Sequence, residues 1–181
     1  MNQYNWLIHT NIKDLSPFKS AMETIKDFKD VSGTTSAIGT DSKQFEIYDG
    51  KEYVIKLGNY IQTNFKGNNF FDVKIFNKVK GYSMWTVEGH KNSYHKLHRH
   101  SPKGDEKTRN NYNLSTVMFL NVPKNKPTGQ FYCLLETKEG TELYNIEPNV
   151  GDLLIFPWSL YHGVYPQGEG KRKTINLDFK F

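Results

Sequence analysis

Cysteine is almost absent from this sequence: Cys133 is the only one, so no disulfide can form within the chain. A chain without disulfides is typical of a reducing compartment, and we therefore expect a cytoplasmic protein. The other residues of segment 131–135 are all aromatic or aliphatic. That setting favours a cysteine buried in the core over a nucleophile.

Long apolar runs and clustered positive charge are also missing. No apolar run is long enough to span a membrane, and the polar N-terminal segment does not resemble a secretion signal. The net charge of +5 comes mostly from scattered lysines, while arginine occurs only at positions 99, 109 and 172. Scattered lysines are typical of a solvated surface, so the sequence does not support a nucleic-acid partner. An acidic metabolite or an anionic cosubstrate is equally compatible with this charge.

The sequence does contain enough apolar material for a core. Its 181 residues are 36% hydrophobic and 14% aromatic, which favours a folded chain over a disordered one and fits one domain. No internal repeat, linker or low-complexity segment divides the chain. We expect a single domain over residues 1–181, with a helical N-terminal support over 1–69 and a β core over 70–181.

Two helices are predicted in the N-terminal third. The first covers 17–29, because Ser16-Pro17 is a typical helix start. Its apolar positions, at helical spacing, are Phe18, Met22, Ile25 and Phe28. The second covers about 51–65. Its apolar face is formed by Tyr53, Ile55, Leu57, Tyr60 and Ile61. A short edge strand is expected near Trp6 to Ile8, and the Gly/Ser/Thr-rich stretch 31–43 is typical of a loop.

Beyond residue 69 the apolar pattern changes to one typical of strands, with Gly, Pro and Asn between the segments. The predicted strands are 70–79, 83–88, 114–122, 130–137, 143–146, 152–156, 160–165 and 171–181. Two helices followed by about eight strands predict a mainly β (α+β) fold, for which an eight-stranded jelly roll is the natural closed arrangement.

The last predicted strand has one apolar and one polar face. The apolar face is formed by Ile175, Leu177, Phe179 and Phe181, and the polar face by Arg172, Thr174, Asn176 and Asp178. If the polar face lines the lumen of the jelly roll, the two N-terminal helices can cover the apolar face from outside. An ordinary sheet whose polar face meets solvent fits the pattern equally well.

Three of the six histidines lie within six residues, at positions 95, 98 and 100. Residues two apart on a strand share a face, so His98 and His100 project together, with Arg99 and His95 on the opposite side. Two neutral imidazoles side by side form half of a site for Fe, Zn, Cu or Ni. A histidine-rich loop in contact with water is the alternative for this pair taken alone.

A candidate third ligand lies farther along the chain. His162 follows the apolar strand 152–156, and Pro157 marks the turn between them. A proline-containing turn just before a histidine fixes where the imidazole points. A lone histidine in an apolar strand is often a core residue, but the separate pair at positions 98 and 100 favours a ligand.

Arg172 is a candidate anion-binding residue. The segment 166–170 has the composition of a turn, so we expect an antiparallel hairpin that returns residues 172–174 to the side of His162. A buried guanidinium beside a metal site binds a carboxylate in bidentate fashion, and Thr174 on the same face can add a hydroxyl donor. A surface arginine is the alternative.

Taken in order, these segments resemble the small 2-oxoglutarate/Fe(II)-dependent oxygenases of the type common in bacteria and phages. The matching stretches are His98-Arg99-His100, 114–123, 151–157 with His162-Gly163-Val164, and Arg172-Lys173-Thr174. The resemblance spans residues 70–181 and implies a double-stranded β-helix, a cupin-like jelly roll with iron at one mouth. It also implies that His162 is the distal histidine ligand, that Arg172 and Thr174 bind the cosubstrate, and that Trp85 is an aromatic residue usual in this subgroup.

The sequence departs from the family pattern at one position. The usual motif is His-x-Asp/Glu, which gives Fe(II) two histidines and one carboxylate, but here His100 occupies the place of the carboxylate. Either His98, His100 and His162 all bind the metal, or Asp105 supplies the acid, or His100 lies behind the ligands. Three histidines without an acid leave Fe(II) more positive than the usual set does.

The resemblance implies an enzyme that uses Fe(II), O2 and 2-oxoglutarate to oxidise a C–H bond of its substrate, with release of succinate and CO2. The sequence does not indicate the substrate. Tyr112, which follows a polar stretch over 101–110, together with Trp85 and His95, is a candidate for contacts to the substrate or to the ligands.

Two other functions are compatible with the sequence. A cupin isomerase or dioxygenase would bind a metal through His98, His100, Asp105 and His162 and would not need 2-oxoglutarate. A barrel that has lost catalysis and serves as a binding module would account for the missing carboxylate. Arg172 favours the oxygenase, because only that class must anchor the far carboxylate of a cosubstrate.

Overall fold

The computed structural model describes residues 6–33, 39, 41–67, 73–100 and 113–181. Its strands are β1 (Ile8–Asn11), β2 (Phe28–Asp30), β3 (Ser42–Ile47), β4 (Gly81–Gly89), β5 (His95–His98), β6 (Leu114–Asn121), β7 (Phe131–Glu136), β8 (Thr141–Ile146), β9 (Asp152–Pro157), β10 (His162–Val164) and β11 (Arg172–Lys180). Its helices are α1 (Ser16–Glu23), α2 (Lys51–Asn64) and the 3-10 helix η1 (Val73–Lys78). Among the described residues, no helix has the length and apolar character needed to cross a membrane.

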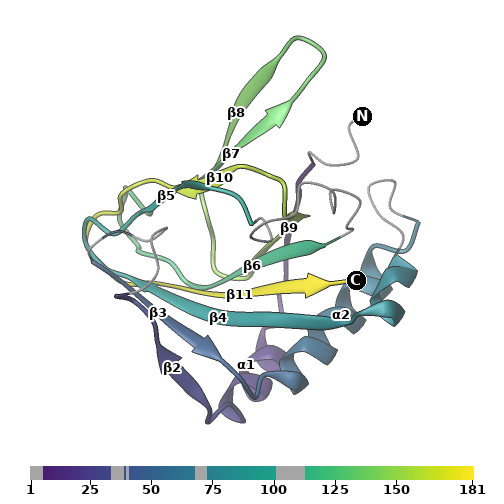
Figure 1. Ribbon diagram of the computed structural model, residues 1–181. Helices are drawn as coiled ribbons and strands as arrows, with labels where there is room; N and C mark the ends of the chain where they lie inside the picture. The colour runs from purple at the N-terminus through teal and green to yellow at the C-terminus, as the bar shows by residue number, and fades with distance from the viewer. Residues whose placement is uncertain (1–5, 34–38, 40, 68–72, 101–112) are drawn as a thin grey trace.

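Two antiparallel β-sheets face each other (Figure 1). The larger sheet has the strand order β1-β9-β6-β11-β4-β3-β2, and the smaller sheet has the order β5-β10-β7-β8. Strands far apart in the sequence are neighbours, since β11 pairs with both β4 and β6. The arrangement is a jelly roll of the double-stranded β-helix type, which confirms the predicted fold class.

Both α-helices pack on the outer face of the larger sheet (Figure 1). α2 buries Tyr53, Leu57 and Ile61, which lie four residues apart on one side of the helix. They join one apolar cluster with the outward-facing residues of β11, which are Ile175, Leu177 and Phe179. The prediction that the helices lie outside the barrel is therefore confirmed, although Ile55 is 51% exposed and does not belong to the apolar face.

The polar face of β11 points into the space between the sheets. Its four residues are almost inaccessible to solvent: Arg172 (1% exposed), Thr174 (5%), Asn176 (6%) and Asp178 (8%). The alternative of a sheet whose polar face meets solvent is therefore wrong. β11 carries four hydrogen-bonding side chains into the interior, and buried groups of this kind need partners.

A second apolar cluster is formed by residues from both sheets. It is formed by Phe119, Phe131, Cys133, Ile146, Leu154, Phe156, Leu160 and Val164. Cys133 is fully buried there, and burial raises the pKa of its thiol to about 12. The thiol is therefore protonated at neutral pH, in agreement with the predicted core position.

The first helix is shorter than the sequence predicts. It ends at Glu23, and Phe28 begins β2, where its side chain is 58% exposed instead of facing a helix core. The Asp49 carboxylate accepts hydrogen bonds from the backbone N–H groups of Lys26 and Asp27, at 2.8 and 3.1 Å. These bonds stabilise a turn after α1, because they satisfy amides that a continued helix would satisfy internally.

Two further segments differ from the prediction. The loop expected over 31–43 ends early, because β3 begins at Ser42 and pairs with β4 along its whole length. The strand expected over 70–79 is wrong over its described part, which is mostly the 3-10 helix η1. Phe76 of η1 packs edge-on against Phe179, with ring centroids 4.9 Å apart, so tertiary packing outweighs the strand-like composition.

Consecutive strands β10 and β11 do not form the predicted hairpin. β10 pairs with β5 and β7 in the smaller sheet, whereas β11 pairs with β4 and β6 in the larger sheet. The expected return of residues 172–174 alongside His162 is therefore wrong, because the connection crosses from one sheet to the other. Arg172 and His162 instead line one cavity from opposite sheets.

Candidate metal centre and cosubstrate pocket

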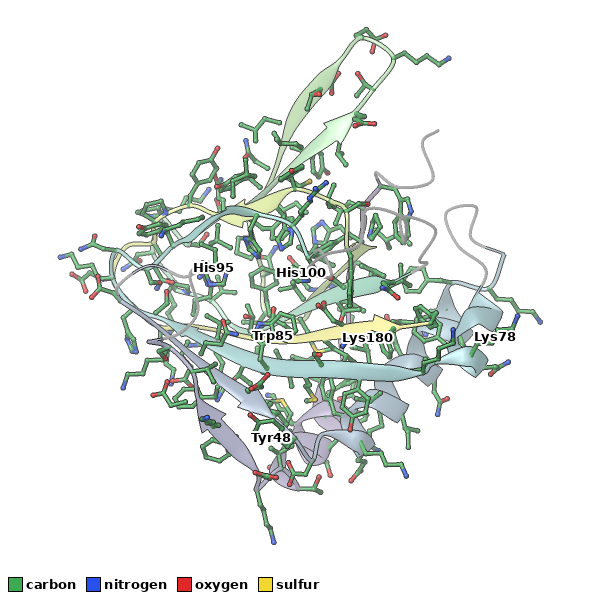
Figure 2. All side chains as sticks on the ribbon, in the orientation of Figure 1. Tyr48, Lys78, Trp85, His95, His100 and Lys180 are labelled. Atoms are coloured by element: carbon green, nitrogen blue, oxygen red, sulfur yellow. The ribbon has the colours of Figure 1, made fainter. Side chains whose placement is uncertain are left out.

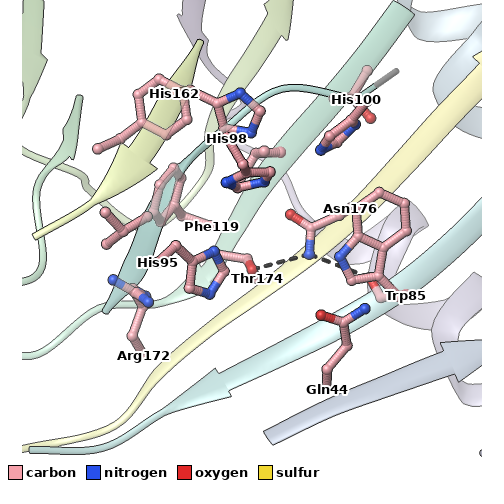
Figure 3. A pocket seen from close by; sticks show the side chains of 14 residues that line it. Gln44, Trp85, His95, His98, His100, Phe119, His162, Arg172, Thr174 and Asn176 are labelled. Atoms are coloured by element: carbon pink, nitrogen blue, oxygen red, sulfur yellow. Dashed lines mark hydrogen bonds between the residues drawn. The ribbon is translucent and has the colours of Figure 1, made fainter. Parts of the chain in front are cut away.

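The two sheets enclose a cavity of about 220 Å³. Its lining includes the described residues that the sequence analysis selects, which are Trp85, His95, His98, His100, His162, Arg172 and Thr174. The other lining residues are Gln44, Thr116, Val117, Phe119, Phe131, Val164 and Asn176. Figure 2 shows that His95, His100 and Trp85 lie between the sheets. In Figure 3 three histidines gather on one side of the cavity, and Arg172 lies with His95 and Thr174 on the other.

His98, His100 and His162 converge on one point. His98 ends β5 and is the register partner of His162, the first residue of β10. His100 lies two residues farther on, where its backbone N–H donates to the Trp158 carbonyl at 3.0 Å. One ring nitrogen from each of the three histidines lies within 4.8 Å of the other two. The two sheet strands and the segment after β5 thus bring the three imidazoles together.

The hydrogen bonds of His98 and His162 determine which nitrogen is free. His98 Nδ1 lies 2.7 Å from the Lys96 carbonyl oxygen, and His162 Nδ1 lies 2.9 Å from the Leu160 carbonyl oxygen. A carbonyl oxygen only accepts, so both Nδ1 atoms carry the proton and donate it. Each Nε2 therefore presents a lone pair to the cavity, as a metal ligand must.

Burial keeps the same two imidazoles neutral. Desolvation lowers the pKa of His98, and it lowers the pKa of His162 well below its ordinary value. Positive charge on His100 and His98 would lower the pKa of His162 further. Neutral imidazoles at physiological pH need no deprotonation before they bind a metal.

The donor set fits a transition-metal ion. Because the three ring nitrogens lie within 4.8 Å of one another, a point between them is no more than about 2.8 Å from each nitrogen. A metal–imidazole bond is roughly 2.1 Å long. Inward movements of less than about 1 Å would complete such bonds. Imidazole nitrogen is a suitable ligand for iron, zinc, copper and nickel, so the chemistry of the donors does not by itself select iron.

His100 has a different partner from the other two histidines. Its Nδ1 lies 3.0 and 2.9 Å from the two carboxylate oxygens of Asp178, and 2.9 Å from Ser115 Oγ. Ser115 also donates its hydroxyl proton to Asp178 at 2.7 Å. His100 is thus tied to a buried carboxylate on β11, whereas His98 and His162 are tied to backbone carbonyls.

His95 lies on the opposite side of its strand from the predicted one. His162 pairs with His98 and Val164 pairs with His95, so three steps along β5 match two steps along β10. The extra residue on β5 is a β-bulge, which reverses the alternation of side chains between the two faces of the strand. The side chain of His95 therefore faces the cavity, beside His98. Arg99 is exposed.

Arg172 is a buried cation without an anionic partner among the described residues. Its Nη1 donates to the Gly129 carbonyl at 3.3 Å, and its Nη2 has no hydrogen-bond partner. A Cβ on Gly129 would lie 2.4 Å from Nη1, so this glycine makes room for the guanidinium. Burial lowers the pKa of Arg172 to about 10, and the group remains charged at neutral pH. A buried, unpaired charge is costly, so the pocket is suited to an anion.

The hydroxyl of Thr174 and the imidazole of His95 line the same side of the cavity as Arg172. Asn176 Nδ2 donates to Thr174 Oγ1 at 3.2 Å and to the Trp85 carbonyl at 3.4 Å. Because Thr174 Oγ1 accepts there, its own hydroxyl proton is available to another acceptor. His95 Nε2 is buried and has no hydrogen-bond partner within the described part of the chain.

Two candidate residues lie outside the part of the chain that the structure describes. Two other residues, at or next to the site, were not predicted to have a role. Asp105 and Tyr112 lie outside the described residues. Gln44 was missed because no strand was expected between the loop over 31–43 and the helix from about 51, and Asp178 was assigned to the polar face of its strand without a role. The alternation of β11 already indicated where Asp178 points, but not that His100 lies opposite.

The sequence matches a known family over the strands that form this cavity. The family model described as "2OG-Fe(II) oxygenase superfamily" covers residues 84–179, which is more than half of the chain. The chain therefore belongs to the 2OG-Fe(II) oxygenase superfamily. A search of curated protein sequences finds no significant match.

Solved structures of low sequence identity share the fold. A Pseudomonas putida prolyl-4-hydroxylase is 15% identical, with 97% of this chain and 92% of that chain covered and a TM-score of 0.65. A Trichoplax adhaerens prolyl hydroxylase in complex with a hypoxia inducible factor peptide is 15% identical (97% and 84% covered; TM-score 0.64). HygX from Streptomyces hygroscopicus, with nickel, 2-oxoglutarate and hygromycin B bound, is 12% identical (97% and 83% covered; TM-score 0.59).

The family membership establishes the class of chemistry. The protein is an oxygenase whose cofactor is Fe(II) and whose cosubstrates are 2-oxoglutarate and O2. This result favours neither the cupin of other activity nor the inactive binding module. The resemblance drawn from the histidine and arginine motifs is confirmed at the level of the family.

Proposed function

We propose that the protein is a 2-oxoglutarate-dependent hydroxylase in which His98, His100 and His162 bind Fe(II) and Arg172 binds the far carboxylate of 2-oxoglutarate. One observation carries the proposal. A single cavity has three converging imidazoles on one side and, on the other, a buried guanidinium with no anionic partner among the described residues. A bifunctional ligand with a metal-chelating end and a distant carboxylate satisfies both sides at once.

The residues of the cavity have distinct tasks in this proposal. Arg172 forms two parallel hydrogen bonds to the carboxylate, and Thr174 adds its free hydroxyl proton. The aromatic walls Phe119 and Phe131 exclude water from the space between the two ends. Bound iron supplies the O2 activation that couples decarboxylation of 2-oxoglutarate to oxidation of the substrate.

The substrate class is open to experiment. The similar structures name a peptide fragment for one protein and hygromycin B for another. We propose that the reaction hydroxylates a C–H bond of the substrate, which reaches the iron through the mouth of the barrel. An assay with candidate peptides and small molecules measures which of them accelerates 2-oxoglutarate turnover.

Turnover of 2-oxoglutarate is the direct test of the proposed activity. With Fe(II) and O2 present, we expect the protein to release succinate, slowly without substrate and faster with it. Omission of Fe(II) or of O2 should stop the release. Absence of succinate from protein that still binds metal and 2-oxoglutarate would contradict the hydroxylase and favour a binding module.

His95 is expected to contribute to cosubstrate binding. Burial and the nearby positive charge of Arg172 lower the pKa of His95 well below its ordinary value, so the ring is neutral and can donate one proton. In Figure 3 it lies beside Arg172, with Nε2 unpartnered among the described residues. We expect His95→Phe to weaken 2-oxoglutarate binding about tenfold, the effect of one lost hydrogen bond to a charged group.

The control for this variant is His90→Phe, because His90 is exposed and does not line the cavity. Calorimetric titration of 2-oxoglutarate into the metal-loaded proteins gives both affinities. Metal affinity should be unchanged in both variants. Equal 2-oxoglutarate affinity in wild type and His95→Phe would remove His95 from the pocket's function.

A further inference from the structure

The proposed set of metal ligands contains no carboxylate, but the carboxylate of Asp178 lies within hydrogen-bond distance of one of them, His100. In the usual set an acid follows the first histidine by two residues, but this chain has His100 there. Asp178 contacts Nδ1 of that same histidine through both carboxylate oxygens, at 3.0 and 2.9 Å. A proton on Nδ1 between the two groups leaves Nε2 unprotonated and turned toward the other histidines.

We infer that Asp178 is a positioning residue for the metal, which holds His100 as an Nε2 ligand and supplies the negative charge that the coordination sphere lacks. This inference rests on the proposed metal site. A carboxylate bonded to the far nitrogen of a ligating histidine fixes its orientation and raises its basicity. With Asp178 included, the formal charge of three histidines and one carboxylate around the ion equals that of two histidines and one carboxylate.

The burial of Asp178 supports a dedicated role. It is 8% exposed, and His100 is its ion-pair partner within the described part of the chain. Ser115, which is 1% exposed, bonds to the same carboxylate and to the same ring nitrogen. A buried carboxylate costs free energy unless its partners are well placed, and here the partners are a proposed metal ligand and the serine bonded to the same ring nitrogen.

The position of Asp178 on β11 connects the two halves of the site. Arg172, Thr174, Asn176 and Asp178 lie at alternate positions of one strand and share its inward face. Three of the four line the cavity, and Asp178 lies behind His100. One strand therefore holds the proposed cosubstrate anchor at its start and the partner of a proposed metal ligand near its end.

The alternative is an ion pair that stabilises the fold and has no effect on the metal. Asp152 provides a matched control, because it is also buried (2% exposed) and also contacts a histidine, with 3.1 Å between its Oδ2 and His9 Nε2. Asp152 does not line the cavity. Asp178→Asn and Asp152→Asn make the same change in charge and volume at two buried carboxylates, only one of which is tied to the metal site.

Co(II) binding, followed by visible absorption and calorimetry, tests the inference. We expect Asp178→Asn to weaken Co(II) binding by about 10–100-fold, as is typical for an outer partner of a ligating histidine. Ser115→Ala should have a smaller effect, because the carboxylate remains. Asp152→Asn should bind Co(II) like the wild type. Equal affinities in Asp178→Asn and Asp152→Asn would overturn the inference while leaving the three-histidine site intact.

A measurement on the unaltered protein covers the case in which Asp178→Asn does not fold. In Zn(II)-loaded wild-type protein, long-range ¹H–¹⁵N NMR correlations report which ring nitrogen of His100 carries the proton. We expect a proton on Nδ1 and a metal-bound Nε2. A proton on Nε2 of His100 in the zinc-loaded protein would overturn the inference, whereas failure of the wild type to bind any metal would overturn the proposed function itself.

Discussion

His162→Ala is expected to abolish tight metal binding. His162 supplies one of three proposed ligands, and its ring is fixed on β10 by the bond from Nδ1 to the Leu160 carbonyl at 2.9 Å. Loss of an outer partner of a ligand costs 10–100-fold in affinity, so loss of the ligand itself should cost more than about 100-fold. Anaerobic titration with Fe(II), or with Co(II) as a stable substitute, measures the affinity.

His98→Ala should have a comparable effect, because His98 is the register partner of His162 and faces the same point. His90→Ala is the matched control, since His90 is exposed and lies outside the cavity. Full metal affinity in His162→Ala would show that the three imidazoles converge for a structural reason alone.

Arg172→Ala is expected to weaken 2-oxoglutarate binding by about 30-fold to several thousand-fold. Truncation of one partner of a buried charge pair costs roughly 2–5 kcal/mol, and each 1.4 kcal/mol is about a factor of ten. Arg172→Lys should recover only part of the affinity, because an ammonium group cannot form the bidentate pair. Metal affinity should remain near that of the wild type, since Arg172 lies on the other side of the cavity from the three histidines (Figure 3).

Arg99→Ala is the control for this prediction, because Arg99 is exposed and lies over the Tyr161 ring, 5.1 Å from its centroid. Titration of 2-oxoglutarate into Mn(II)-loaded wild type, Arg172→Ala, Arg172→Lys and Arg99→Ala gives the order of affinities. Unchanged affinity in Arg172→Ala would contradict the assignment of the carboxylate pocket.

The β core could be predicted from the sequence because its strands carry a pattern that the structure uses directly. In β11, apolar Ile175 and Leu177 face the helices, while Arg172 and Thr174 face the interior. Alternation of this kind fixes the facing of a strand once one face is buried. The N-terminal strands were harder, because β2 is a three-residue edge strand whose exposed Phe28 gives no clean alternation, and β3 lies between it and β4.

Pairing between distant segments could not be predicted from local pattern. The turn-like composition after His162 suggested a hairpin, yet the connection crosses between the sheets. The position of His95 depends on a bulge that appears only once β5 is paired with β10. Asp178 was assigned to the correct face, but its contact with His100 joins residues 78 positions apart. The periodicity of the sequence determines which face of a strand a side chain occupies, whereas its contacts across the barrel depend on the tertiary fold.

The most direct test of the account is a titration of 2-oxoglutarate into the wild-type protein with and without Mn(II). If the histidines and Arg172 hold one bifunctional ligand, metal and cosubstrate strengthen each other's binding by the same factor. We expect 2-oxoglutarate to bind much more tightly to the Mn(II)-loaded protein than to the metal-free protein. Equal affinity in the two states, or no binding in either, would contradict the proposal that this cavity is a joint site for iron and 2-oxoglutarate.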